Sequence, residues 1–355
     1  MAVRKKRTAV KPRAARTRRS APAIRRKVRI DLLFTCVGRR IELVELFRRA
    51  ADALQIKLRV HGTDINWTAP AMHRVDSPHI VPRIDEEPYI PSLLELARRE
   101  RIDLIIPTID SDLPALSSAA ARFAEIGTRV IISSESVVRT CRDKLTTCRL
   151  LQSAGIDTPQ TWTLDEALAL TDQRFPYYMK PREGSAEKGN YVIRSAEELR
   201  TLGARVPDPI VQEYIRGTEH TLDVYCGFDG VPRCVVPRKR LEVRTGEVSK
   251  GVIVKDERIM EIGRRVADVL GDCRGVITVQ CMRTPEGRIR VIEINPRFGG
   301  GAPLAIEAGA DFPRWLLAEY LGRKVRIDPL GFRDHLAMLR YDRSVFVDSL
   351  DNHQP

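Results

Sequence analysis

The sequence has no apolar run of the ~18–20 residues that a membrane-spanning helix needs, which excludes an integral membrane protein. It also has no C-x-x-C pair, and its seven cysteines stand singly. The six histidines show neither H-x-x-H nor H-E-x-x-H spacing, which argues against a zinc site. Free thiols in a reducing compartment are the simplest interpretation of this cysteine pattern, so we expect a cytoplasmic protein.

Acidic residues are missing from the first 27 residues, which contain twelve Lys or Arg. The other 328 residues hold 48 basic and 47 acidic side chains, so nearly all of the net charge of +13 belongs to this segment. Because it has few large apolar residues to bury, we expect residues 1–27 to form a disordered basic tail. Three roles stay open for the tail: a solvated extension, weak electrostatic contact with nucleic acid or an anionic surface, or an organelle transit peptide.

Residues 28–139 alternate between strand and helix patterns, which predicts a parallel sheet covered on both faces, as in Rossmann-like domains. The strands are expected at 28–35, 57–65, 103–110 and 128–133, and the helices at 41–54, 92–102 and 113–127. No G-x-G-x-x-G follows the first strand, so we reject dinucleotide binding. Polar residues at the strand ends fit caps and a substrate role equally well: Gly38, Arg39, Asp64, Asp110 and Asp112.

Residues 140–349 have a different pattern, in which runs of strands are separated by helices. The pattern predicts a helix after 140 ended by Gly155, strands on both sides of the loop 183–190, and further strands over 209–254. The pattern ends with a helix at 257–270, a hairpin over 275–295 and one helix over 303–322. The unit is therefore expected to be a mixed α+β body, with a small subdomain at about 140–210 and a large one at about 211–349, before a C-terminal tail at 350–355.

The segment "VIEINPRFGGG" at 291–301 carries the strongest chemical signal. Glu293 and Asn295 are two residues apart on a strand, so their side chains leave the same face. Gln280 lies on the partner strand of the hairpin, where pairing can bring it beside Glu293. Three oxygen donors on one face suit magnesium, which accepts few carboxylates and completes its shell with phosphate oxygens and water. Arg297 follows Pro296 and is expected to balance the acid or to hold phosphoryl oxygens.

Two lysines and a glycine-containing loop precede this hairpin. Lys180 ends the strand "YYMK", and Lys144 stands at a helix start, so both can meet phosphates. The loop "EGSAEKGN" at 183–190 offers backbone N–H groups to phosphate oxygens, although it is not a Walker A loop. In "VQEYIRGTE", the backbone around Glu213–Ile215 can hydrogen-bond an adenine edge, and Glu219 can accept from ribose hydroxyls.

In this order and spacing, the E-x-N-P-R motif at 293–297 with Gln280, and "QEYIRGTE" after a Lys-Pro strand and a glycine loop, resemble the ATP-grasp superfamily. The short, single-unit relatives of the carbamoyl-phosphate synthetase large subunit are the nearest match. The resemblance covers nearly all of 28–349 and implies a Rossmann-like pre-ATP-grasp domain followed by an ATP-grasp fold. Glu187, Lys188 and Asn190 depart from the expected loop composition.

The resemblance also implies site residues. Catalysis would use Arg297 and Lys180, and magnesium, with manganese as a substitute, would bind Gln280, Glu293 and Asn295. The residues that would contact ATP are Lys144, Lys180, Gly184, Ser185, Gly189, Glu213, Ile215 and Glu219. For the basic segment 238–250, a clamp on an anionic substrate made by Arg238, Arg240 and Lys250 is no better supported than a solvated hairpin. Asp223 is either a structural partner of one of these cations or a substrate contact.

The implied activity is an ATP- and Mg²⁺-dependent ligase that joins a small-molecule carboxylate to an amine, or a thiol, through an acyl phosphate and releases ADP and phosphate. Carbamoyl-phosphate synthesis itself is not expected, since the chain lacks a second synthetase half and a glutaminase-like segment. The alternative is a catalytically silent ATP-binding regulatory or scaffold protein tethered by its basic tail. A homodimer is left open as the assembly.

Overall fold

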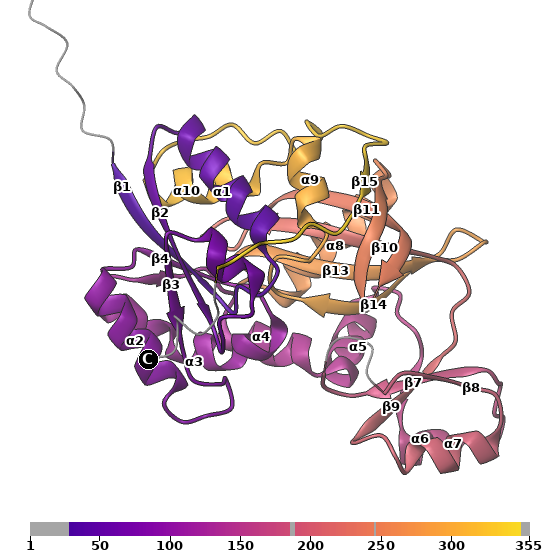
Figure 1. Cartoon of the computed structure of the whole chain (residues 1–355). Coiled ribbons are helices and arrows are strands. Elements are labelled where there is room, and N and C mark those ends of the chain that lie inside the picture. The colour runs from indigo at the N-terminus through magenta and orange to yellow at the C-terminus, as the bar shows by residue number, and fades with distance from the viewer. Residues whose placement is uncertain (1–27, 185–188, 245, 349–355) are drawn as a thin grey trace, which may run out of the picture.

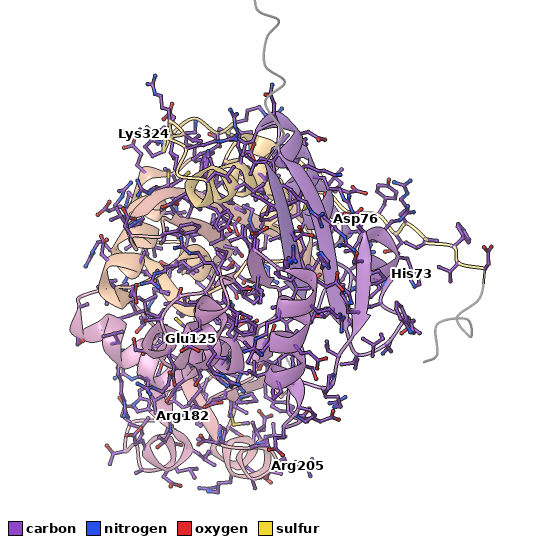
Figure 2. The ribbon with its side chains drawn as sticks, turned by 90° about the vertical axis from the view of Figure 1, so that its left-hand side faces the viewer. His73, Asp76, Glu125, Arg182, Arg205 and Lys324 are labelled. Carbon is purple, nitrogen blue, oxygen red and sulfur yellow. The ribbon has the colours of Figure 1, made fainter. Side chains whose placement is uncertain are left out.

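The computed structural model of the chain describes residues 28–184, 189–244 and 246–348. Figure 1 shows an N-terminal domain built on one sheet, a large sheet beside it, and a small subdomain at the end of the molecule. This arrangement confirms the predicted α/β and α+β organisation. In Figure 2, Arg182 and Arg205 of the small subdomain lie at the opposite end of the molecule from Lys324. Both predicted tails, 1–27 and 350–355, lie outside the described residues.

The N-terminal sheet is parallel, with strand order β3-β2-β1-β4-β5. Its strands are β1 (Arg29–Thr35), β2 (Lys57–Asp64), β3 (Ser77–Ile80), β4 (Leu104–Pro107) and β5 (Arg129–Val130). Its helices are α1 (Ile41–Ala53), α2 (Tyr89–Glu100) and α3 (Leu113–Glu125), with 3₁₀ turns η1 (Pro70–Arg74) and η2 (Asp110–Asp112). Leu32 and Phe34 pack with α1 on one face, and Leu33 packs with α2 and α3 on the other, as alternation along a strand requires.

The small subdomain is an antiparallel sheet in the order β6-β9-β7-β8, covered by two short helices. Two helices lead into it from the N-terminal domain, α4 (Glu135–Arg142) and α5 (Lys144–Ser153). Its own elements are β6 (Thr161–Thr163), α6 (Leu164–Leu168), β7 (Tyr177–Pro181), β8 (Tyr191–Ile193), α7 (Ala196–Gly203) and β9 (Pro209–Glu213). The predicted divisions at 139/140 and 210/211 fall within α4 and β9, so the domain boundaries remain predictions.

The large sheet is antiparallel, in the order β14-β13-β10-β11-β12-β15. Its strands are β10 (Thr218–Cys226), β11 (Pro232–Arg244), β12 (Glu247–Ile253), β13 (Gly275–Arg283), β14 (Ile289–Asn295) and β15 (Ala337–Leu339). Its helices are α8 (Glu257–Leu270), α9 (Ala302–Ala308) and α10 (Phe312–Tyr320). One apolar core joins this sheet to the α1 face of the N-terminal sheet, where the Phe47 and Phe298 rings meet edge to face at 5.9 Å. The large sheet and the N-terminal domain are thus packed together (Figure 1).

Three predicted elements differ from the structure. The helix expected over 303–322 is two helices, because Gly309 takes a positive φ of 120° and Asp311 caps a new start. The helix expected after 140 is broken at Asp143, whose extended backbone ends α4 while its side chain caps α5. The strand expected over 128–133 is only two residues long. The short edge strands β3, β6 and β15 and the helices α6 and α7 were not predicted.

Within the described residues, no helix is long and apolar enough to cross a membrane. All seven cysteines are free; six are buried and Cys36 is half-buried. The thiols therefore pack as small core residues, which is the interpretation that the sequence favoured.

Candidate active site

The hairpin β13–β14 places the three predicted metal ligands together. Gln280 is the register partner of Glu293, and Asn295 lies two residues further on the same face. The Asn295 amide nitrogen donates to the Gln280 Oε1 and to the Glu293 Oε1, each at 3.2 Å. Three side chains that carry oxygen ligands thus converge on one point of the sheet. Their role in binding a metal remains a prediction.

Two buried lysines approach this point from the small-subdomain side. Lys180 on β7 is 5% exposed, and its Nζ donates to the Ile292 carbonyl at 3.3 Å. Lys144, the first residue of α5, is 8% exposed and donates to the Gly184 carbonyl at 2.9 Å. Burial lowers the pKa of Lys144 and the charge of Lys180 adds to this, whereas Glu293 opposes it. Two partly desolvated ammonium groups attract an anion strongly.

Arg297 links the large sheet to the N-terminal domain. Its guanidinium forms an ion pair with Asp110, 187 residues earlier in the chain, and also donates to the Phe298 carbonyl at 3.1 Å. The Arg297 Nε and the Asp110 Oδ1 are buried without a hydrogen-bond partner in the described structure. Buried polar atoms of this kind are rare and often mark a place that a ligand fills. Asp110 is a site residue that sequence analysis left undecided; its position after a strand of the parallel sheet was the available signal.

A cavity of about 110 Å³, which we call the central pocket, collects these groups. It brings together eight predicted residues: Lys144, Lys180, Gly184, Arg240, Gln280, Glu293, Asn295 and Arg297. Asp110, Pro181, Glu183, Asn190 and Gly246 complete its lining. Lysine, arginine, carboxylate and amide groups from three parts of the chain therefore meet in one small, polar space, which can bind a phosphoryl group and a hard cation.

The remaining predicted ATP contacts that the structure describes are not part of the central pocket lining. The Glu219 carboxylate accepts from the Gln280 Nε2 at 3.0 Å and from Arg240, so it contacts one of the predicted metal ligands. Glu213 ends β9, and its carboxylate accepts from Arg290 at 2.7 Å. Ile215 is half-buried in the segment that links β9 to β10.

The predicted cover loop is described only at its ends. Gly184 lines the central pocket with a φ of 125°, and Gly189 has a φ of 79°, conformations that favour glycine. A Cβ on Gly189 would also come within 3.2 Å of Pro181. Ser185 lies outside the described residues, as do Glu187 and Lys188. The role of this loop remains a prediction.

Only one of the three predicted substrate cations reaches the central pocket. Arg240 lines it, whereas Lys250 pairs with Glu242 at 2.6 Å on the surface of the β11–β12 hairpin. Arg238 is 1% exposed and donates to the two Asp223 carboxylate oxygens at 2.5 and 3.1 Å. Asp223 is thus the structural partner of a cation, one of the two alternatives that the sequence left open. A substrate contact by Arg238 finds no support in this geometry.

Replacing Arg238 by Ala is expected to destabilise the protein by about 3–5 kcal/mol, because the substitution leaves the Asp223 carboxylate buried without a counter-charge. Its guanidinium also fills the space over the glycine run, where a Cβ on Gly301 would clash with it. Chemical denaturation of both proteins measures the loss. A change in stability below 1 kcal/mol would show that the pair is not structural.

Asp112 of the N-terminal domain is also structural. Its buried carboxylate accepts from the Tyr89 hydroxyl at 2.6 Å and from Thr35. Burial raises the pKa of Asp112 to about 6, although both hydrogen bonds lower it. The folded protein therefore holds a proton that the unfolded chain releases near pH 4.

The Asp112 carboxyl predicts a pH dependence of stability. Because its pKa is higher in the folded state, its contribution to stability is complete below about pH 4 and is lost as the pH rises to about 6, by roughly 2–3 kcal/mol. Denaturation of the wild type and of Asp112→Asn at pH 4.5 and 7 measures this change. The difference between the two proteins should vary with pH by this amount, and a constant difference would contradict the assignment.

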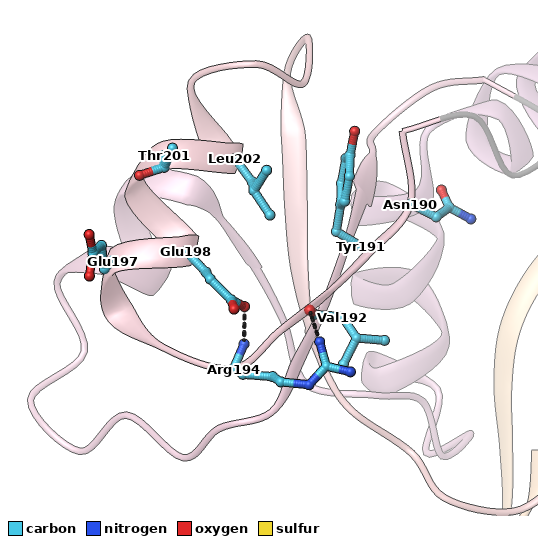
Figure 3. A pocket seen from close by; sticks show the side chains of 8 residues that line it. All are labelled: Asn190, Tyr191, Val192, Arg194, Glu197, Glu198, Thr201 and Leu202. Carbon is cyan, nitrogen blue, oxygen red and sulfur yellow. Dashed lines mark hydrogen bonds between the residues drawn. The ribbon is translucent and has the colours of Figure 1, made fainter.

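A wider hollow of about 610 Å³ lies on the outer side of the small subdomain (Figure 3). It is lined by β8 and α7, and it shares only Asn190 with the central pocket. In Figure 3, the Arg194 backbone N–H donates to the Glu198 carboxylate, and the Arg194 guanidinium donates to the Val192 carbonyl at 3.4 Å. The hollow gathers none of the predicted site residues and is not part of the candidate site.

Comparison with known proteins agrees with this geometry. A D-alanine--D-alanine ligase of Fusobacterium nucleatum is 33% identical over 24% of this chain and 28% of its own length. A phosphoribosylamine--glycine ligase of Synechocystis sp. is 25% identical over 58% of this chain and 55% of its own length. The chain thus spans 28% of the length of the first curated relative and 55% of the length of the second.

Among solved structures, the biotin carboxylase domain of Hydrogenobacter thermophilus 2-oxoglutarate carboxylase superposes with a TM-score of 0.70 over 86% of this chain and 73% of that chain. At 18% identity, this similarity shows the fold. Family models match in two places: residues 32–131 match the PylC-like N-terminal domain, and residues 141–301 match the ATP-grasp domain. The chain therefore carries a PylC-like N-terminal domain followed by an ATP-grasp domain.

Proposed function

We propose that this protein is an ATP- and Mg²⁺-dependent ligase that joins a carboxylate to an amine, or to a thiol, and releases ADP and phosphate. The observation that carries the proposal is the central pocket, where Lys144, Lys180 and Arg297 face the Gln280–Glu293–Asn295 set. The named ligases among its relatives support ligation in general, and the biotin carboxylase domain was solved with MgADP and bicarbonate.

The residues of the hairpin fit a magnesium ion. Gln280, Glu293 and Asn295 offer one carboxylate and two side-chain amides, and the Asn295 amide nitrogen lies 3.2 Å from the Gln280 and Glu293 oxygens. Such a set is hard in character and low in charge. Magnesium would remain accessible to phosphate oxygens in such a set. When bound, it would neutralise phosphate charge and orient the terminal phosphoryl group. Manganese, which prefers similar oxygen ligands, would substitute for it.

The protein's own side chains would supply the rest of the charge. Lys180 and Lys144 place ammonium groups in the lining of the central pocket. These groups would bind phosphate oxygens and replace the water that hydrates the phosphate charge in solution. Arg297, fixed by Asp110, would hold the transferred phosphoryl group and the carboxylate that attacks it. At about 110 Å³ the central pocket is below the ~300–1,000 Å³ of whole-ligand pockets, so only the reacting groups would lie inside it.

In the proposed reaction, a carboxylate oxygen attacks the γ-phosphorus of ATP, and the bond from that phosphorus to the bridging oxygen breaks to release ADP. An amine then attacks the acyl carbon, and phosphate leaves with the bonding electrons. Positioning and charge neutralisation would provide most of the acceleration, and formation of the acyl phosphate needs no general base. The adenine and ribose would meet the segment 213–219, with Glu219 nearest the metal set.

ADP release from MgATP tests the proposal when pools of carboxylates and amines are added to the full chain. We expect release that requires one carboxylate pool and one amine or thiol pool together. Binding of MgADP without release in any pool would favour a catalytically silent nucleotide-binding protein. If MgADP does not bind at all, the proposed function is wrong. Size-exclusion chromatography with light scattering in the same samples shows whether the protein forms the homodimer that the sequence left open.

A further inference from the structure

A cavity of about 590 Å³ lies in the N-terminal domain, and we call it the sheet-end cavity. It is bounded by residues that follow four neighbouring strands: Cys36 and Gly38 after β1, Asp64 and Ile65 at β2, Val81 to Asp85 after β3, and Ile109 and Ser111 after β4. Open parallel sheets bind ligands outside the carboxyl ends of their strands, where the strand order reverses. The order β3-β2-β1-β4-β5 reverses at β1, in the middle of this cavity. Its volume is that of a small-molecule pocket.

The lining has an apolar majority and one carboxylate without a cation. Ile65, Val81, Pro82, Ile84 and Ile109 supply apolar surface. Its two arginines already have acidic partners: Arg83 donates to Asp85 at 3.3 Å and Arg142 to Glu183 at 2.7 Å.

Asp64 is different. Its carboxylate accepts only backbone N–H groups, from Gly38 at 3.0 Å and from its neighbour Ile65 at 2.8 Å, and no ion pair of the described residues includes it. A carboxylate has about four acceptor positions, so Asp64 keeps capacity for a ligand that donates hydrogen bonds. The sheet-end cavity is therefore suited to an apolar body with a donor group rather than to an anion.

A third cavity shares lining residues with both the sheet-end cavity and the central pocket. Ser111 and Arg142 line both the sheet-end cavity and this third cavity of about 100 Å³. That smaller cavity shares five residues with the central pocket: Asp110, Lys144, Gly184, Glu293 and Asn295. The Asp110 Oδ1 that lacks a partner belongs to a residue at this junction. Asp64 lies on β2, two strands away from β4, the strand that Asp110 follows.

We propose that the sheet-end cavity binds the amine substrate of the ligase, and this inference rests on the proposed function. The apolar body of this amine occupies the sheet-end cavity, and a hydrogen-bond donor group of the body donates to the Asp64 carboxylate. The amine nitrogen lies beyond Ser111, where it donates to Asp110. This site replaces the β11–β12 hairpin as the place of the acceptor, because Arg238 and Lys250 of that hairpin already have acidic partners.

The test compares 1-aminopentane, 5-amino-1-pentanol and pentanoate as probes, titrated against the full chain by ligand-observed NMR. Ile65→Trp fills the sheet-end cavity from a residue that is 45% exposed and can therefore tolerate the change. Val28→Trp, at a similarly exposed position beside the opposite end of β1, is the matched control. Asp64→Asn keeps the size of the side chain and removes its charge. Thermal unfolding of each variant checks that it is folded, and Ile84→Trp is the second blocking variant.

We expect both amines to bind the wild type and Val28→Trp at least tenfold more tightly than pentanoate does. Ile65→Trp and Ile84→Trp should weaken both amines at least tenfold, and Asp64→Asn should remove the advantage of the amino alcohol. Amine binding that is absent, or that survives both Trp variants, would overturn the site. Pentanoate binding that equals amine binding would overturn the substrate class. The MgADP affinity of every variant, measured by calorimetry, should stay within twofold of the wild-type value. If MgADP does not bind the wild type, the result would count against the proposed function instead of the sheet-end cavity.

Discussion

Glu293→Gln is expected to lower MgATP-dependent ADP formation by about 10²–10³-fold while the protein stays folded. Glu293 is the one carboxylate in the Gln280–Glu293–Asn295 set, and the substitution keeps its shape while removing its charge. Loss of a charged ligand weakens the metal set, and it also removes the carboxylate that raises the pKa of Lys144 against the effect of burial. The loss should be partly recovered by raising the magnesium concentration, because weaker metal binding is one of its causes.

Glu242→Gln is the matched control for Glu293→Gln. Glu242 pairs with Lys250 on the surface of the β11–β12 hairpin, outside the central pocket lining. This control should keep ADP formation within twofold of the wild type. Equal activity of Glu293→Gln and the wild type at every magnesium concentration would exclude the β13–β14 hairpin as the metal site.

Arg297→Ala is expected to reduce kcat by about 10²–10³-fold with a smaller effect on nucleotide binding. The guanidinium leaves the central pocket, and the Asp110 carboxylate loses its ion-pair partner. Because Arg297 would act mainly on charge that develops during phosphoryl transfer, the loss should fall on kcat rather than on KM. Steady-state kinetics with the identified substrates measures both constants, and Arg297→Lys should restore only part of the rate, since lysine cannot reproduce the planar fork.

The control for Arg297→Ala is Arg264→Ala, in which an arginine on α8 loses its surface ion pair with Glu261. Surface pairs contribute little, so its kinetics and stability should match the wild type. A similar kcat for Arg297→Ala and Arg264→Ala would contradict the phosphoryl-holding role of Arg297. If Arg297→Ala does not fold, the result would instead indicate that the ion pair of Arg297 with Asp110 stabilises the structure.

The contacts that could be predicted from the sequence are local ones. Gln280 and Glu293 lie on two strands of one hairpin, so counting from the turn was enough to bring them together. The parallel N-terminal sheet was also predictable, because its strands and helices alternate with clear periods. These features depend on few residues that are close in sequence.

The contacts that could not be predicted join distant parts of the chain. The Arg297–Asp110 pair spans 187 residues and depends on how the N-terminal domain packs against the large sheet through Phe47 and Phe298. Arg238 gave no signal of burial, since an arginine in a basic segment is usually solvated, and only its partner Asp223 on the neighbouring strand makes burial tolerable. The sheet-end cavity is likewise assembled from four strand ends and has no motif of its own.

The most direct test of the central claim is to trap the acyl phosphate with hydroxylamine. The full chain is incubated with MgATP and the carboxylate pool, without any amine, and hydroxylamine is added as the nucleophile. We predict that carboxylate hydroxamate and ADP form in equal amounts, and that both are lost in Glu293→Gln. Formation of AMP and pyrophosphate in place of ADP, or ADP release with no hydroxamate from any carboxylate, would contradict a phosphoryl transfer to carboxylate in the central pocket.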